Sequence, residues 1–310
     1  MSKRDAAVCR VTVVMALAFA GAAPLAAQTV LANGYEVGTP GALDAVLDEL
    51  GESQIAVVAG DGDANPEAIL AAGREVILAL NREGFDVFVL PIGFYEGLWL
   101  DRALNEPIPD SLATWPIYRV WQESPEFRQL LEAIHSVRRA GGRLAVAGVL
   151  SRYHAIGKSL YAPHLTEALD GAGAPLPARL ATAVNSTWGG RERLSRASPE
   201  VRVRALRLAM PVLGHLDEKR DAFVAAWGAE RFEFERQCVV NMRTFVELEQ
   251  LRAGDVPADD DFARLEQTQN FEWFLHTGFP GRRLIVWEGR GASESPVPAG
   301  SHRIALELRE

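Results

Sequence analysis

Polar side chains gather in the loops that directly follow the predicted strands of this 310-residue chain. They are Asp61, Asp63, Glu96, Tyr153, His154, Glu288 and Arg290. In open parallel sheets, ligands bind beyond the carboxyl ends of the strands, where such loops meet. We therefore expect these side chains to line one pocket for a small-molecule ligand.

The chemistry open to this pocket depends on His154, the histidine best placed for a site. An imidazole can act as a general base near neutral pH. If Asp61 or Glu288 oriented the ring, the pair could activate water for attack on an ester or lactone. The alternative is a loop histidine without function, so the sequence by itself assigns no residue as catalytic.

A strand, loop, helix and second strand are predicted within residues 54–91. The apolar run at 55–59 is typical of a buried strand, and the glycines and aspartates at 60–63 favour a turn after it. Asn65 and Pro66 are typical of a helix start. Gly84 can end this helix before a second apolar run at 85–90. The stretch predicts a right-handed βαβ unit, from which the site loops extend.

The rest of the chain predicts more of the same sheet and a large helical region. Apolar runs at 143–149 and 283–287 predict parallel strands, and Ser124 and Gly141 mark the limits of a helix. Residues 159–252 have helical patterns, and 302–309 fits an edge strand. We predict an α/β fold with a parallel-stranded sheet built from βαβ units. A helical insertion at about 159–277 would belong to a single domain covering 28–310.

The N-terminus is typical of a secretory signal peptide. Lys3, Arg4 and Arg10 accompany an apolar run at 11–23, and small residues follow at 24–27. The run is shorter than the roughly 20 residues of a membrane span, so a retained membrane anchor is the less favoured alternative. We predict that residues 1–27 are removed and that the mature protein is periplasmic or extracellular, with no membrane association.

Composition excludes several classes of partner. The net charge of −9, without a cluster of Lys and Arg to offset it, argues against binding to nucleic acid. Of the two cysteines, Cys9 falls in the predicted signal peptide and Cys238 in a helical pattern, so we expect a buried thiol and no disulfide. The histidines show no close ligand pairing, and we expect neither a metal nor a cofactor.

Several short motifs follow one another along the chain: GDGDAN at 60–65, GFDVFVLP at 84–91, GVL at 148–150, NFEW at 270–273 and WEGRGA at 287–292. Their order resembles the erythromycin esterase-like family. That family has Gly-Glu-x-x-His-Gly, Gly-Phe-x-x-Phe-x-Leu-Glu, Gly-Phe-Asp, Asn-x-x-Trp and Trp-x-His-Asn-x-His in these places. The resemblance covers residues 54–287, most of the chain, and implies the fold of the family.

The resemblance also implies that the catalytic set of the family is missing. Its histidines would fall at Ala64, Gly289 and Ala292, its strand-end glutamate at Pro91 and its aspartate at Leu150, while its first glutamate is shortened to Asp61. Alanine and glycine can neither accept a proton nor orient a base. We therefore expect a binding or structural module without hydrolase activity. The alternatives are a hydrolase rebuilt around His154 and an α/β domain unrelated to the family.

Overall fold

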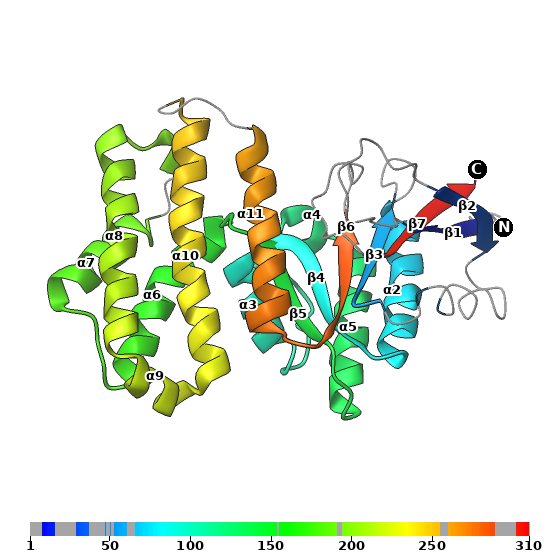
Figure 1. The fold of residues 1–310 in the computed structure, drawn as a ribbon, viewed down its shortest axis with the longest axis horizontal. Helices are drawn as coiled ribbons and strands as arrows, with labels where there is room; N and C mark the ends of the chain where they lie inside the picture. Colours follow the sequence, from blue (N-terminus) through cyan, green and yellow to red (C-terminus); the bar gives the residue numbers. More distant parts are fainter. Residues whose placement is uncertain are drawn as a thin grey trace, which may run out of the picture.

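The computed structural model of the protein describes residues 8–15, 29–36, 47, 50, 53–60, 66–153, 155–190, 194–254, 260–288 and 302–309. Its centre is a seven-stranded sheet with the order β2-β1-β7-β3-β6-β4-β5 (Figure 1). Five neighbouring strands are parallel: β7 (His302–Arg309), β3 (Ile55–Gly60), β6 (Arg283–Glu288), β4 (Phe85–Gly93) and β5 (Ala145–Leu150). The predicted parallel α/β sheet is confirmed, because four of these strands cover the predicted apolar runs.

The N-terminal segments extend this sheet in the antiparallel sense. Strand β1 (Val8–Met15) pairs with β7 along its whole length, and β2 (Thr29–Glu36) pairs with β1. The prediction of an edge position for 302–309 is therefore wrong, since β7 lies between β1 and β3. Residues 11–15, the first part of the apolar run that suggested a signal peptide, lie in β1. A short apolar segment can also pair as a strand.

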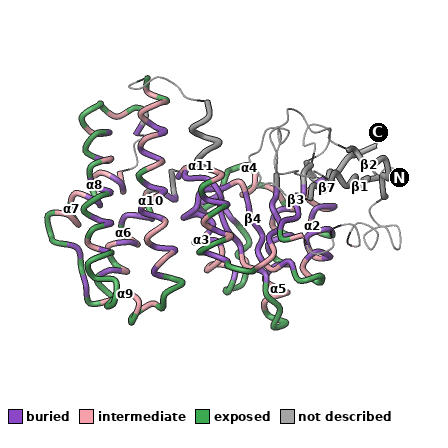
Figure 2. Tube along the Cα trace, in the orientation of Figure 1, coloured by how far each residue is buried: buried purple, intermediate pink, exposed green. Residues whose placement is uncertain are grey.

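Helices cover both faces of the parallel strands (Figures 1 and 2). Helices α2 (Pro66–Arg82) and α5 (Pro125–Arg139) share one apolar core with Ala56 and Phe88. Helices α6 (Ala155–Gly171), α8 (Pro199–Glu218), α10 (Ala229–Arg252) and η2 (Phe274–Gly278) share the other core with Val57 and Val89. Neighbouring strand residues belong to opposite cores because side chains alternate across a strand.

The helical insertion lies between β5 and β6, as the sequence predicts. It also contains α7 (Ala178–Thr187), η1 (Leu194–Arg196), α9 (Arg220–Trp227) and α11 (Asp260–Trp273). Before it, α3 (Phe94–Ala103) follows β4, and a short α4 (Arg119–Gln122) precedes α5. None of the helices that the structure describes is long and apolar enough to cross a membrane.

The start of α5 shows how local sequence sets an element. The hydroxyl of Ser124 accepts a hydrogen bond from the backbone N–H of Phe127 at 3.1 Å, and Pro125 occupies the first turn. Gly141 follows the helix with a φ of 83°, which glycine adopts without a steric cost. Both limits of this helix are therefore those predicted from the sequence.

Candidate functional site

The structure describes two of the predicted pocket side chains, Glu96 and Tyr153. Asp61, Asp63, His154 and Arg290 lie outside the described residues, and so does the side chain of Glu288, whose backbone ends β6. The predicted convergence of the whole set on one pocket therefore stays a prediction. The packing and hydrogen bonds of Glu96 and Tyr153 show how the described part of this sheet edge is arranged.

Glu96 is a buried carboxylate in a helix, where the sequence allowed either a loop or a short helix after the second strand. Helix α3 begins at Phe94 directly after β4, so Glu96 falls in its first turn, where its exposed fraction is only 1%. A Cβ added at Gly93 would lie 1.9 Å from one carboxylate oxygen, and one added at Gly157 would lie 2.0 Å from the other. The carboxylate thus fills a space between the end of β4 and the start of α6 that exists because both neighbours are glycine.

A second pair of glycines brings α3 onto β5. A Cβ at Gly97 would lie 2.0 Å from the backbone nitrogen of Gly148, and a Cβ at Gly148 would lie 2.0 Å from the carbonyl oxygen of Gly93. The absence of side chains lets these backbones approach closely. The first turn of α3, and Glu96 with it, is therefore fixed against the carboxyl ends of β4 and β5.

Tyr153 anchors the segment after β5 to the helical layer. Its hydroxyl donates a hydrogen bond to the carbonyl oxygen of Cys238 in α10 at 2.9 Å. Its ring packs near those of Tyr95, Tyr161 and Phe245, at centroid distances of 6.2, 5.3 and 5.5 Å. Burial, followed by the neighbouring Tyr161, raises the pKa of Tyr153 well above its ordinary value, and Glu96 adds to the rise. The phenol therefore stays protonated, and its contacts are structural.

A buried amide network joins the end of β5 to α10 and α11. Asn270 donates hydrogen bonds to the carbonyl oxygen of Val149 and to Oδ1 of Asn241, both at 2.8 Å. Asn241 also accepts a hydrogen bond from the hydroxyl of Ser151, and its own amide donates to the carbonyl of Gln237 at 3.0 Å. Ser151, Asn241 and Asn270 are each at most 2% exposed. Sequence reasoning missed Ser151 and Asn241. A polar side chain on the apolar face of a helix is a possible signal, and Asn241 lies on that face of α10, three residues after the buried Cys238.

Leu150 and Pro91 are the positions at which the resemblance to the erythromycin esterase-like motifs would place acidic side chains. Leu150, at the end of β5, is 8% exposed and belongs to the apolar core shared with the helical layer. Pro91 lies half-buried within β4. The side chains at these two positions are therefore apolar, and the buried carboxylate of Glu96 lies next to Gly93 at the end of β4.

A charged cluster connects α3, α6 and α10 deeper in the same layer. Glu235 is fully buried, and its Oε1 accepts hydrogen bonds from Nη2 of Arg102 at 2.9 Å and from Nε2 of His164 at 3.2 Å. Arg231, one helical turn earlier on α10, pairs with the same oxygen at 3.7 Å. Burial raises the pKa of Glu235, but His164 and Arg102 outweigh it, so the pKa lies below its ordinary value. The sequence did not reveal this cluster, because its members are far apart along the chain.

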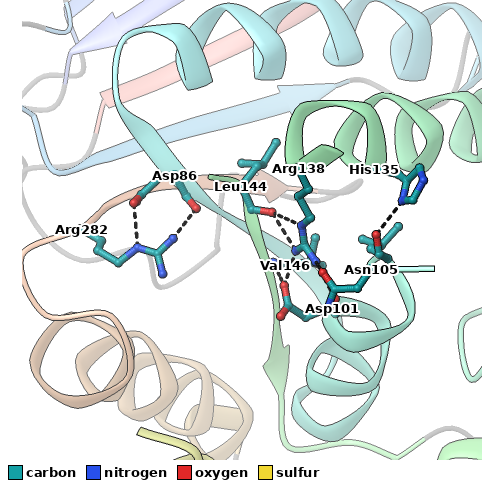
Figure 3. Close-up of polar contacts among 9 residues, drawn as sticks. Asp86, Asp101, Asn105, His135, Arg138, Leu144, Val146 and Arg282 are labelled. Atoms are coloured by element: carbon teal, nitrogen blue, oxygen red, sulfur yellow. Dashed lines mark hydrogen bonds and ion pairs between the residues drawn. The ribbon is translucent and has the colours of Figure 1, made fainter. Parts of the chain in front are cut away.

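The other histidines whose side chains the structure describes have backbone partners or are exposed. His135 contacts the carbonyl oxygen of Leu104 at 2.8 Å (Figure 3), and His215 contacts that of Ala174 at 3.0 Å. His276 is exposed near the end of the insertion. Among the residues that the structure describes, no group of three or more His, Cys, Asp or Glu side chains could hold a metal ion.

A cleft of about 490 Å³ lies at the opposite end of the sheet, by the amino ends of β5 and β6. Its walls come from α3, from the first turn of α10 and from the segment before β6. Figure 3 shows how its polar edge is held. Asp101 accepts hydrogen bonds from Arg138 and from the backbone N–H of Val146, and Arg282 donates to Asp86 at 2.8 Å. These ion pairs fix α3 and the start of β6 around the cleft.

Solved structures with a similar arrangement of sheet and helices exist. The chain is similar to a Bacillus cereus protein, with a TM-score of 0.64 and 14% identity over 84% of this chain and 64% of the other. It is also similar to a histidine-to-asparagine mutant of the erythromycin esterase EreC in its open conformation, with a TM-score of 0.60 and 11% identity over 79% of this chain and 63% of the other. The protein has an erythromycin esterase-like fold.

A succinoglycan biosynthesis protein is a further structural neighbour, with a TM-score of 0.56 and 12% identity over 81% of this chain and 60% of the other. The sequence matches no protein-family model and, to a significant level, no curated protein. The chain spans 60% to 64% of the length of the three similar structures. At these identities the likeness shows the fold alone, because the same fold can support unrelated functions.

Proposed function

We propose that this protein is an exported, erythromycin esterase-like protein that binds a small molecule and does not hydrolyse esters through the histidine chemistry of that family. The observation that carries the proposal is the apolar character of Leu150, buried at the end of β5, and of Pro91 within β4, where the resemblance would place carboxylates. The resemblance supports it, because it would place the family histidines at Ala64, Gly289 and Ala292 of this sequence.

The physical reason is that ester hydrolysis in such a site needs a base for water and a group that orients the base. Leucine and proline side chains have no atom for either role. Glu96 is the carboxylate that the structure describes at this edge, and at 1% exposure it is closed off from bulk solvent. The glycines around it leave room for its carboxylate and for little else, which favours a structural role.

A panel of chromogenic esters and lactones tests this proposal with the purified protein. We expect turnover at the rate of the uncatalysed reaction, and we expect Glu96→Gln to leave that rate unchanged. General acid–base catalysis contributes about a hundred- to ten-thousand-fold in rate, so an active site would be plain in such an assay. Saturable turnover that depends on the folded protein would refute the proposal.

A rebuilt hydrolase is the second candidate, because His154 follows the anchored Tyr153 in the sequence. Its base would be His154, oriented by Asp61 or Glu288. This candidate requires that His154→Ala abolish the activity and that Asp61→Asn or Glu288→Gln weaken it. Under the favoured proposal, His154→Ala changes neither the fold nor the background signal.

Export rests on the order of charged, apolar and small residues at the N-terminus. Removal of residues 1–27 would take β1 out of the sheet, and β2 would lose the strand with which it pairs. Strand β7 would then become the edge of the parallel sheet, next to β3. The exported form would therefore keep the parallel strands that carry the proposed site.

A further inference from the structure

Two buried polar atoms without a protein partner lie in the region where α3, α6 and α10 pack together. Oε2 of Glu235 and the hydroxyl of Tyr161 have no hydrogen-bond partner among the residues that the structure describes. Both side chains are 0% exposed. A buried polar group that stays unpaired costs its full desolvation free energy, so such groups are nearly always bonded to protein or to ordered water. These two atoms therefore indicate a site for a further hydrogen-bonding molecule.

Contacts along α6 and α10 place Tyr161 close to Glu235. Tyr161 lies one turn before His164 on α6, and His164 contacts Oε1 of Glu235 at 3.2 Å. The ring of Tyr95 on α3 packs against both α6 side chains, with its centroid 5.0 Å from that of Tyr161 and 5.6 Å from that of His164. Side chains three residues apart on a helix lie on the same face, so Tyr161 and His164 point into the same region.

The pKa shifts of this region agree with that placement. Burial raises the pKa of Tyr161 well above its ordinary value, and the neighbouring Cys238 and Glu235 raise it further. Burial also raises the pKa of the Cys238 thiol well above its ordinary value, and Glu235 again adds to the rise. The phenol therefore keeps its proton and is a hydrogen-bond donor, whereas the ionised Glu235 is an acceptor.

One water molecule can join two such atoms when they are too far apart for a direct bond. The Cβ atoms of residues three apart on a helix are about 5–6 Å from each other, which is the offset between Tyr161 and His164. A water that bonds to two oxygens at about 2.8 Å each spans up to about 5.6 Å. The offset of one turn between Tyr161 and the His164–Glu235 contact therefore suits a single bridging molecule.

The charges around Glu235 favour a neutral molecule at this site. Arg102 and Arg231 pair with Oε1 of Glu235 at 2.9 and 3.7 Å. These guanidinium groups would repel a cation at Oε2, and the carboxylate itself would repel an anion. The site therefore needs a neutral molecule that donates to a carboxylate and accepts from a phenol. Water does both, and buried water typically makes about three hydrogen bonds to polar groups that are otherwise unpaired.

We propose that α3, α6 and α10 enclose an ordered water molecule, which donates a hydrogen bond to Oε2 of Glu235 and accepts one from the hydroxyl of Tyr161. The water gives the second oxygen of the carboxylate a donor, as Arg102 and His164 do for the first. It also joins α6 to α10 beside the pair of His164 and Glu235. The site lies within the helical layer, so it is independent of the proposed function.

A crystal structure at a resolution that shows ordered water tests the proposal directly. We expect a water peak within about 2.5–3.0 Å of both Oε2 of Glu235 and the hydroxyl of Tyr161. A direct hydrogen bond between these two atoms, a peak that contacts only one of them, or no peak at either would overturn the proposal.

The urea midpoint of Tyr161→Phe tests the same site by the sign of its shift. If the water is bound, the substitution removes a buried hydrogen bond, and the midpoint should fall. If the hydroxyl is unpaired, the substitution removes a desolvation cost, and the midpoint should rise. Tyr153→Phe is the matched control, since its hydroxyl donates directly to the carbonyl oxygen of Cys238 at 2.9 Å and its midpoint should fall. A midpoint of Tyr161→Phe at or above that of the wild type would overturn the proposal.

A double-mutant cycle shows whether the two groups share the water. The loss caused by Tyr161→Phe should be smaller in a Glu235→Gln background, because the neutral amide holds the water less strongly than the carboxylate. Circular dichroism would show that each variant is folded. Equal losses from Tyr161→Phe in both backgrounds would contradict a water shared by Glu235 and Tyr161.

Discussion

The side-chain amide of Asn270 donates a hydrogen bond of 2.8 Å to the backbone carbonyl oxygen of Val149, across 121 residues of sequence. This bond ties α11 to the carboxyl end of β5, inside a layer where both partners are buried. Asn270 also bonds with Asn241, so the two insertion helices and the sheet share one polar junction. The junction positions the helical layer over the strand ends.

Replacement of Asn270 by alanine should destabilise the protein by about 1–3 kcal/mol, because the carbonyl of Val149 and the amide of Asn241 would lose buried partners. Urea denaturation of the purified variant measures the change in the free energy of unfolding. Gln269→Ala is the control, since this neighbour on α11 is exposed. Equal stability of the two variants would show that the junction contributes nothing.

Replacement of Gly157 by alanine should cost about 1–3 kcal/mol of stability, because the new methyl group would overlap the carboxylate of Glu96. The cost should shrink when Glu96 is also replaced by alanine, and a double-mutant cycle measures this coupling. In α8, Gly214 has no atom within 4 Å of an added Cβ. Gly214→Ala should therefore stabilise by about 0.5–1 kcal/mol. A cycle with no coupling between positions 96 and 157 would contradict the packing described for Glu96.

The ion cluster around Glu235 should make stability depend on pH. Its pKa is lower in the folded protein than its ordinary value, despite burial, because His164 and Arg102 stabilise the ionised form. The unfolded chain therefore binds a proton at higher pH, and the stabilisation is present above the ordinary carboxyl pKa and is lost as the pH falls through the folded pKa.

Glu235→Gln removes this contribution. Denaturation of both proteins between about pH 7 and about pH 3 should show the advantage of the wild type decreasing toward acid. A difference between the two proteins that stays constant over this range would rule out the ionised Glu235 as its source.

Export should be visible in the N-terminus of the mature protein. N-terminal sequencing of material from the periplasm or medium should begin near residue 28, as the predicted signal peptide requires. Because β1 would then be absent, amide hydrogen exchange in 302–309 should be faster than in the full-length chain, where β1 pairs with β7. A protein that keeps Met1 and stays in the cytosol would rule out export.

Much of the fold could be predicted from local patterns. The apolar runs of β3, β4, β5 and β6 are distinctive because both faces of a parallel sheet are buried. The limits of α5 follow from Ser124, Pro125 and Gly141, which act within one turn. The antiparallel position of β1 could not be predicted, because the same apolar run is typical of a signal peptide and no local feature specifies its pairing with β7.

The candidate site was predictable only in part, since its partners are distant in sequence. Glu96 is buried because Gly93 and Gly157 leave space for its carboxylate, and a sequence does not show which glycine meets which side chain. In the sequence, Glu235 is one of several charged residues of a long helix. Only the structure shows that Arg102 and His164 contact its carboxylate. The resemblance of 270–273 to Asn-x-x-Trp, in contrast, pointed to a residue that the structure finds at a buried junction.

Incubation of the purified mature protein with erythromycin, followed by mass spectrometry, tests the central claim most directly. Hydrolysis of the lactone adds one water to the mass of the macrolide. The account predicts that this product forms no faster than in buffer, and equally slowly with His154→Ala, because Pro91 in β4 and Leu150 at the end of β5 provide neither a base nor its orienting group. Rapid formation of the hydrolysed macrolide by the wild type, abolished in His154→Ala, would contradict the account and establish a hydrolase with a rebuilt site.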